Sequence, residues 1–229
     1  MHETEFMPST PHLDDALDRV LPQLRELGSA TVYEAQGALG VWGAMDAGIK
    51  PVDHRIRLAG RAFTVQMRPA DNLMLHYALI KAAPGDVLVV DAQGFLEAGP
   101  WGDVLTAQAQ KLGLAGLVID GAVRDANAIV DAGFPVFCRG LSIKGTGKHQ
   151  PGRVGLAVNV GGVLVQPGDV IVGDRDGIAV VAADRVHEVL AASLAREEKE
   201  AAMRASIAAG ATTVELMNLG EMLRGLGLD

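Results

Sequence analysis

Four short apolar segments in the middle of this chain alternate with segments of helical periodicity, and this alternation constrains the fold most strongly. The apolar segments, which are typical of buried strands, cover residues 57–67, 87–91, 114–120 and 134–140. The segments between them carry apolar side chains at helical spacing in residues 72–83, 101–112 and 126–132. The pattern is typical of parallel β-α-β units, so it predicts an α/β protein.

The flanking segments predict further elements around this centre. Residues 1–12 are expected to form a loose arm, and residues 13–27 a helix that Gly28 ends. Ser29 or Thr31 is expected to cap a second helix, and residues 154–181 are rich in β-forming residues with glycine turns. No Pro-rich or Ser-rich linker interrupts the sequence. A single domain over residues 1–229 is therefore expected.

One long helix is predicted over residues 183–209, with a length of roughly 40 Å at 1.5 Å per residue. Its first half has an apolar stripe that includes Val186, Val189 and Leu190, whereas its second half is mostly charged. A helix that continues beyond its own apolar face often reaches over a neighbouring subunit. A solvated terminal helix is the alternative, and the sequence leaves both open.

Charge and composition argue against several classes of protein. The formal net charge is −8, and no basic stripe of the kind that binds nucleic acid is visible. No apolar run approaches the roughly 20 residues of a membrane span, and the N-terminus is too polar for a secretory signal. Cys138 is the one cysteine, so no intrachain disulfide forms, and its apolar neighbours predict that it is buried. We therefore expect a cytoplasmic protein without nucleic-acid or membrane partners.

The sequence DGAVRD, residues 120–125, follows an apolar strand and combines two aspartates with an arginine. Ligands of open α/β sheets collect at the carboxyl ends of the strands. Arg124 offers a forked cation for a carboxylate, and Asp125 offers a hard oxygen for a metal. The alternative is ordinary structure, because an aspartate before a helix is often an N-cap and adjacent Arg and Asp often form a salt bridge.

The helix that begins near residue 102 offers a second half of the same candidate site. Its first-turn N–H groups lack intrahelical partners and attract anions, although most helix starts hold only water. These groups belong to Gly102, Asp103, Val104 and Leu105. If strand 117–120 lies beside strand 87–91, this turn opens into the same crevice as Arg124. Asp103 then adds a second oxygen for the metal.

The remaining polar motifs narrow the choice of metal and ligand. The six histidines lack zinc spacings and there is one cysteine, so carboxylates with water favour Mg²⁺ or Mn²⁺ over zinc. His76 lies on a mostly apolar helix and is expected to be packed rather than catalytic. The glycine-rich segment 144–148, KGTGK, lacks the spacing of a phosphate-binding P-loop. A plain surface loop is favoured there over a mobile anion-binding loop.

The stretches WGDVLTAQAQKLGLAGLVIDGAVRD, FPVFCRG and GGVLVQPGDVIVGDRDGIAVV together resemble the RraA-like family. TVYEAQG and GLSIKGTGK look like its aldolase branch, and the resemblance covers about residues 29–209. It implies a single-domain β/β/α sandwich of the swivelling-domain type, with trimers that pair into hexamers and a divalent metal. The implied activity is cleavage of 4-hydroxy-4-methyl-2-oxoglutarate or 4-carboxy-4-hydroxy-2-oxoadipate in aromatic catabolism. The products are pyruvate plus pyruvate or oxaloacetate, and oxaloacetate is decarboxylated through the same enolate.

The resemblance also implies roles for individual residues. The amides of residues 102–105 would hold the pyruvyl carboxylate, Arg124 would contact the pyruvyl group and Asp125 would face the metal. Asp103 would reach the metal through water. So would Glu200 of a neighbouring subunit, with Glu197 and Glu198 as alternatives. No residue is identified as the general base, for which a metal-bound water is the working assumption.

The sequence leaves two alternatives to a metal-dependent aldolase open, one in function and one in mechanism. Some relatives bind and inhibit the endonuclease that degrades messenger RNA, and they do so without metabolite chemistry. A lysine Schiff base is the second alternative, with Lys144 and Lys148 as candidates.

Overall fold

The computed structural model describes residues 15–228 of the protein. Its centre is a nine-stranded sheet whose main path runs β1-β5-β4-β3-β2-β10-β11, with β6 beside β4 and β7 beside β2. A separate hairpin consists of β8 and β9. The strands are β1 (Lys50–Pro51), β2 (Leu58–Gln66), β3 (Asp86–Phe95), β4 (Gly116–Val123), β5 (Val136–Cys138), β6 (Gly140–Leu141), β7 (Arg153–Val154), β8 (Val158–Val160), β9 (Val163–Val165), β10 (Val170–Gly173) and β11 (Ile178–Val181).

The helices follow the order that the sequence periodicity predicts. They are α1 (Asp15–Leu27), α2 (Ser29–Ala38), α3 (Leu73–Leu79), α4 (Asp103–Lys111), α5 (Ala126–Ala132), the 3-10 helix η1 (Ala183–Arg185), α6 (Val186–Ala208), α7 (Thr213–Leu216) and α8 (Gly220–Gly225). The helix expected over 72–83 is shorter, because the amides of Ile80 and Lys81 bond to carbonyls only three residues back and so tighten the last turn. The arm expected over residues 1–12 lies outside the described residues.

The four central strands β2, β3, β4 and β5 are parallel neighbours, as the alternating pattern predicts. Val89 of β3 pairs with Thr64 of β2 on one side and with Val118 of β4 on the other. Every residue of β4 is buried, which is typical of a parallel strand covered on both faces. The expected adjacency of strands 87–91 and 117–120 is therefore confirmed.

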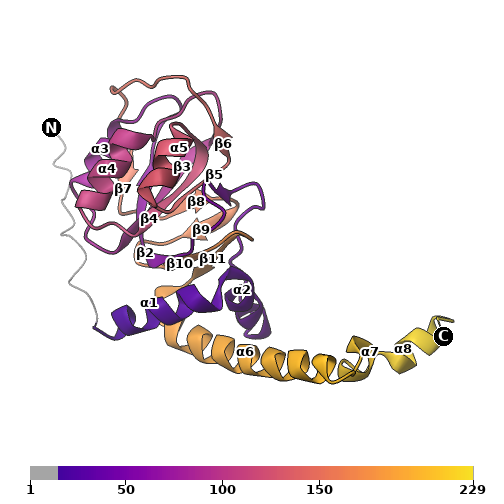
Figure 1. The fold of residues 1–229 in the computed structure, drawn as a ribbon. Helices are drawn as coiled ribbons and strands as arrows, with labels where there is room; N and C mark the ends of the chain where they lie inside the picture. Colours follow the sequence, from indigo (N-terminus) through magenta and orange to yellow (C-terminus); the bar gives the residue numbers. More distant parts are fainter. Residues whose placement is uncertain (1–14, 229) are drawn as a thin grey trace.

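Different elements cover the two faces of the sheet. Helices α3, α4 and α5 lie on one face (Figure 1), where Leu75, Leu105 and Ile129 pack on strand residues such as Ile119. The β8–β9 hairpin covers the other face, and Val160 belongs to its apolar cluster. Helices, sheet and hairpin form the three layers of the expected β/β/α sandwich, which is confirmed.

A third apolar cluster joins α1, α2 and the first half of α6 to strands β10 and β11. The buried residues of α6 are Val186, Val189, Leu190 and Ser193, all in its first half. The rest of α6 continues with α7 and α8 as an arm that projects away from the sheet (Figure 1). The long C-terminal helix is confirmed; its contact with a neighbouring subunit stays a prediction.

Two expectations from composition can be compared with the structure. Cys138 is buried, and its burial raises the pKa of the thiol to about 11, so it packs as a small apolar side chain. Within residues 15–228, no helix is both long enough and apolar enough to cross a membrane.

Candidate functional site

A pocket of about 180 Å³ opens at the carboxyl ends of the central parallel strands, where α/β sheets bind ligands. Its lining comes from α3, the start of α4, the loop after β4 and the loop before β7. The lining residues are Asn72, His76, Pro100, Gly102, Asp103, Val104, Leu105, Arg124 and Lys148. Arg124 and the predicted helix start at residues 102–105 therefore share one small pocket.

The start of α4 is fixed by the buried indole of Trp101. This ring is stacked on Phe134 at 6.3 Å between centroids, and its Nε1 donates a 2.8 Å hydrogen bond to Thr106 Oγ1. The Trp101 carbonyl accepts a 2.9 Å bond from the Arg124 amide. Through its indole and its backbone carbonyl, Trp101 thus ties the first turn of α4 to the loop that carries Arg124.

Two protein carboxylates occupy amides of the α4 start. The Asp103 amide donates to Asp125 Oδ2 at 3.3 Å, and the Val104 amide donates to Asp103 Oδ1 at 2.7 Å. Charged oxygens are favoured at this end because the helix dipole is positive there. The helix start attracts anions as expected, and here the anions come from the protein itself.

Arg124 and Asp125 lie side by side at this helix start. The Arg124 Nε is 3.4 Å from Asp125 Oδ2, and both side chains are partly exposed. Asp125 has a left-handed backbone (φ 55°), which aspartate tolerates better than most residues. Gly102 permits the close approach, because a Cβ there would overlap Asp125 Oδ2 and lie 3.0 Å from Arg124 Cγ. Asp125 itself does not line the pocket but contacts the helix start that does.

The first aspartate of DGAVRD has a different role. Asp120 is 8% exposed, pairs with Arg139 and accepts a 2.8 Å hydrogen bond from the Gly161 amide between β8 and β9. Arg139 also contacts Asp46 at 3.0 Å. Asp120 therefore anchors the hairpin layer. Of the motif, Arg124 lines the pocket, and Asp125 bonds to the helix start beside it.

Asn72 and His76 form one wall of the pocket. The sequence predicted a packed His76 and indicated no role for Asn72. Asn72 is 7% exposed and its Nδ2 donates to the Pro100 carbonyl at 3.0 Å. Burial, and to a lesser extent the nearby Lys148, lowers the pKa of His76 below its ordinary value. His76, which the sequence predicted to be packed rather than catalytic, is partly buried and also lines the pocket. An i, i+4 pair of polar residues on one short helix was the signal available in the sequence.

The KGTGK segment is partly a wall of the pocket and partly a surface loop. Lys148 lines the pocket, whereas Lys144 is paired with Glu97 on the surface. Both lysines are exposed, as a surface loop predicts, and Lys148 in addition lines the pocket. Sequence spacing alone did not separate the two lysines.

A buried carboxylate fixes the position of Lys148. Asp71 is 2% exposed and accepts hydrogen bonds from the amides of Leu73 (3.0 Å), His149 (2.7 Å) and Gln150 (3.2 Å). Burial alone would raise the pKa of Asp71, but these N–H groups together lower it below its ordinary value. Asp71 thus joins the start of α3 to the loop that carries Lys148.

The donor set near the pocket fits a hard divalent cation that keeps part of its water shell. Asp103 and Asp125 supply two carboxylates within contact of one helix start. Mg²⁺ is commonly held by one or two carboxylates together with water and substrate oxygens. Among residues 15–228, no group of three or more His, Cys, Asp or Glu side chains is gathered for a metal.

Glu200, the predicted contribution of a neighbouring subunit, lies on α6 and lines a different pocket from Arg124. Its carboxylate pairs with Arg196 at 2.7 Å and Arg204 at 3.5 Å within the same chain. Glu197 pairs with Arg204. One chain alone does not bring Glu200 to Asp125, so its role at the metal stays a prediction.

The chain is similar to known proteins in sequence and in fold. The family model described as RraA-like, Aldolase/RraA, matches residues 29–180. A protein of Halalkalibacterium halodurans with the provisional name 4-hydroxy-4-methyl-2-oxoglutarate aldolase is 42% identical over 142 residues, which are 62% of this chain and 68% of that protein.

Two solved structures are also similar to the chain. A protein of Pseudomonas syringae without an assigned activity superposes with a TM-score of 0.77 at 28% identity, over 90% of this chain and 97% of that one. RraAS2 of Streptomyces coelicolor, described as an unusual member of the RNase ES inhibitor RraA protein family, has a TM-score of 0.75 at 31% identity, over 82% and 98% of the two chains. The family match spans the sheet, the hairpin and the whole pocket. The chain belongs to the RraA-like family.

Proposed function

We propose that this protein is a divalent-metal-dependent lyase that releases pyruvate from 4-hydroxy-2-oxo diacids. The substrates are 4-hydroxy-4-methyl-2-oxoglutarate or 4-carboxy-4-hydroxy-2-oxoadipate, and the same site decarboxylates oxaloacetate. The observation that carries the proposal is the convergence of Arg124, the α4 start and Asp103 on one pocket of about 180 Å³. The similarity to the H. halodurans protein supports the same reaction class.

The pocket residues suit a substrate with a 2-oxo carboxylate at one end. The α4 start offers N–H groups and a positive dipole to the carboxylate, once the protein carboxylates now bonded there give way. Arg124 offers a fork of N–H donors to the carboxylate and the adjacent 2-oxo oxygen. Lys148 supplies a second cation for the other acidic end.

Cleavage breaks the C3–C4 bond and leaves its electron pair on the pyruvyl half as an enolate. Arg124 is placed to stabilise the negative charge that then develops on the 2-oxo oxygen. Oxaloacetate loses carbon dioxide through the same enolate, so one set of residues serves both reactions. Asp125 and Asp103 would hold Mg²⁺ or Mn²⁺, which acts as a Lewis acid on the 2-oxo oxygen when bound.

One assay separates this proposal from inhibition of a ribonuclease, the role that the description of RraAS2 gives that protein. Pyruvate release from the two 4-hydroxy-2-oxo diacids and from oxaloacetate is measured beside binding to an RNase E-type endonuclease. The proposal expects turnover of at least one oxo-acid. Stoichiometric binding and inhibition of the nuclease without any turnover would instead support the inhibitor function.

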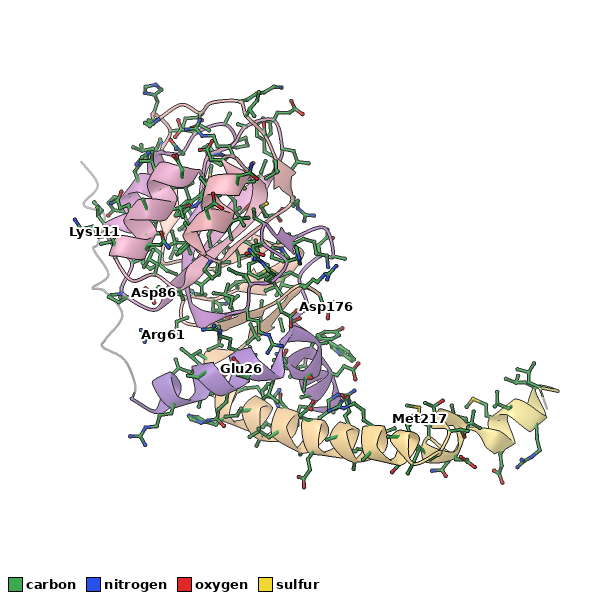
Figure 2. The ribbon with its side chains drawn as sticks, in the orientation of Figure 1. Glu26, Arg61, Asp86, Lys111, Asp176 and Met217 are labelled. Carbon is green, nitrogen blue, oxygen red and sulfur yellow. The ribbon has the colours of Figure 1, made fainter. Side chains whose placement is uncertain are left out.

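We also propose that the protein is a homo-oligomer, a trimer or a hexamer, and that the α6–α8 arm contacts a neighbouring subunit. The arm exposes large apolar side chains away from the sheet, and Figure 2 shows Met217 there. These exposed side chains are Ile207, Val214, Met217, Met222, Leu226 and Leu228. Such a surface is stable in water when another chain covers it.

Replacing Met217 and Met222 with glutamate is expected to dissociate the oligomer, because two charges would have to be buried at its interface. Light scattering should then give the mass of a single chain, 23.9 kDa. Lys111→Glu on the exposed side of α4 changes the net charge by the same amount, −2, and should leave the mass unchanged. An unchanged mass in the double methionine variant would place the interface elsewhere.

A further inference from the structure

Two buried polar atoms of the pocket wall lack hydrogen-bond partners within residues 15–228. They are Asn72 Oδ1 and His76 Nε2, which lie one helical turn apart on α3. An unpartnered buried polar atom typically costs about 1–3 kcal/mol, so native proteins seldom keep two of them together. Their place in the lining of a pocket indicates that a bound ligand satisfies them.

The chemistry of the two atoms defines the ligand group. The Nδ2 of Asn72 already donates to the Pro100 carbonyl, which leaves its Oδ1 as an acceptor. The Nε2 of a neutral imidazole is also an acceptor when the proton is on Nδ1. With the proton on Nδ1, both atoms are acceptors. A hydroxyl can share its one hydrogen between them, whereas a carboxylate has no hydrogen to give.

Of the residues that line the α3 side of the pocket, His76 is the one that can accept a proton. Lys148 and Arg124 have donors only, and the amide of Asn72 is not basic. Asp103 belongs to the α4 start rather than to the α3 wall, and it is one of the two carboxylates proposed to hold the metal. If the pyruvyl group lies against Arg124, C4 and its hydroxyl must fill the part of the pocket that α3 lines.

The charged groups that face the pocket keep His76 in its accepting form. They are Lys148, Arg124 and Asp103. Burial first, and Lys148 second, lowers the pKa of His76, so its ring is neutral at neutral pH.

We propose that His76 is the general base of the cleavage reaction, with Asn72 Oδ1 as the residue that orients the substrate hydroxyl. The C4 hydroxyl proton moves to His76 Nε2 and the oxygen forms a carbonyl as the C3–C4 bond breaks. The bonding pair of C3–C4 becomes the enolate of the pyruvyl half. The imidazolium can then return the proton to C3 of that enolate, which restores neutral His76 and gives pyruvate.

This inference rests on the proposed function, but it predicts a difference between two reactions at the same site. Cleavage of a 4-hydroxy-2-oxo diacid requires removal of a hydroxyl proton, whereas decarboxylation of oxaloacetate has no such proton to remove. His76→Gln should therefore lower kcat for cleavage about 100-fold or more, the usual contribution of a general base. The same variant should lower kcat for decarboxylation less than about threefold on the same principle.

Three measurements keep the test interpretable. The affinity for oxalate, a planar mimic of the pyruvate enolate, should be preserved in His76→Gln and so report an intact pocket. His187→Gln, an exposed histidine on α6, is the matched control and should retain both activities. Asn72→Ala should lower cleavage more than decarboxylation, in the same direction as His76→Gln, because the hydroxyl loses the acceptor that orients it beside His76.

Equal loss of both activities in His76→Gln would overturn the inference alone, since the wild-type protein would still be a lyase. Loss of oxalate binding in His76→Gln would also overturn it, because the residue would then act by shaping the pocket. A wild-type protein that turns over none of these oxo-acids would overturn the proposed function and the inference with it.

Discussion

Replacing Arg124 with alanine is expected to lower kcat/KM about a thousandfold for both cleavage and decarboxylation. Both reactions develop enolate charge, and removal of one preorganised donor from such a site costs about 10²–10³ in rate. Arg124 also offers the forked donors proposed to hold the substrate carboxylate, so KM should rise as kcat falls. Pyruvate release from oxaloacetate and from the 4-hydroxy-2-oxo diacids measures both effects.

The fold should survive this substitution. The Arg124 side chain is 43% exposed, and its ion pair with Asp125 is partly solvated, so it contributes little to stability. Thermal unfolding should therefore be close to that of the wild type. Arg124→Lys keeps the charge without the fork and should give an intermediate rate. An alanine variant that keeps most of its kcat/KM would remove Arg124 from the site.

The second large effect is expected when divalent metal is removed from the protein. Incubation with EDTA is expected to lower cleavage about 100-fold or more, because a Lewis acid typically supplies several kcal/mol of transition-state stabilisation. Mg²⁺ or Mn²⁺ should restore the rate. Asp125→Asn should weaken metal activation, since an amide is a poorer ligand for a hard cation. Asparagine also tolerates the left-handed backbone at this position, so the variant should fold.

The EDTA experiment, combined with borohydride trapping, also tests the Schiff-base alternative. Lys144 is paired with Glu97, whereas Lys148 lines the pocket and is the lysine that an oxo-acid would meet. Borohydride reduction in the presence of pyruvate should leave both lysines unmodified. Full activity in EDTA together with a trapped adduct on Lys148 would replace the metal mechanism with a covalent one.

The central fold was predictable because its signals are local. A parallel strand such as β4 is apolar throughout, and the helices between the strands repeat their apolar residues at helical spacing. The pair Arg124 and Asp125 and the helix start at Gly102 were predictable for the same reason. Each follows directly from the end of one strand or the beginning of one helix.

The α3 wall of the pocket was not predictable in this way. His76 lines the pocket beside Lys148 because Asp71 joins the start of α3 to the 147–150 segment, and these contacts join residues almost 80 positions apart in the chain. Glu200 presents the opposite problem. Its pairing with Arg196 and Arg204 is local, but its proposed role depends on a second copy of the chain, which the sequence does not place.

The anchoring of the loop at Asp71 has a consequence for substrate choice. Within the loop, that carboxylate holds the amides of His149 and Gln150, while residues 145 and 146 lie ahead of this anchor. Insertions or exchanges there should leave α3 and its neighbours undisturbed, because surface loops tolerate changes in length at little thermodynamic cost. Loop grafting at 145–146 should therefore change the chain ahead of Lys148, the pocket-lining residue of this loop, without rebuilding the centre of the fold.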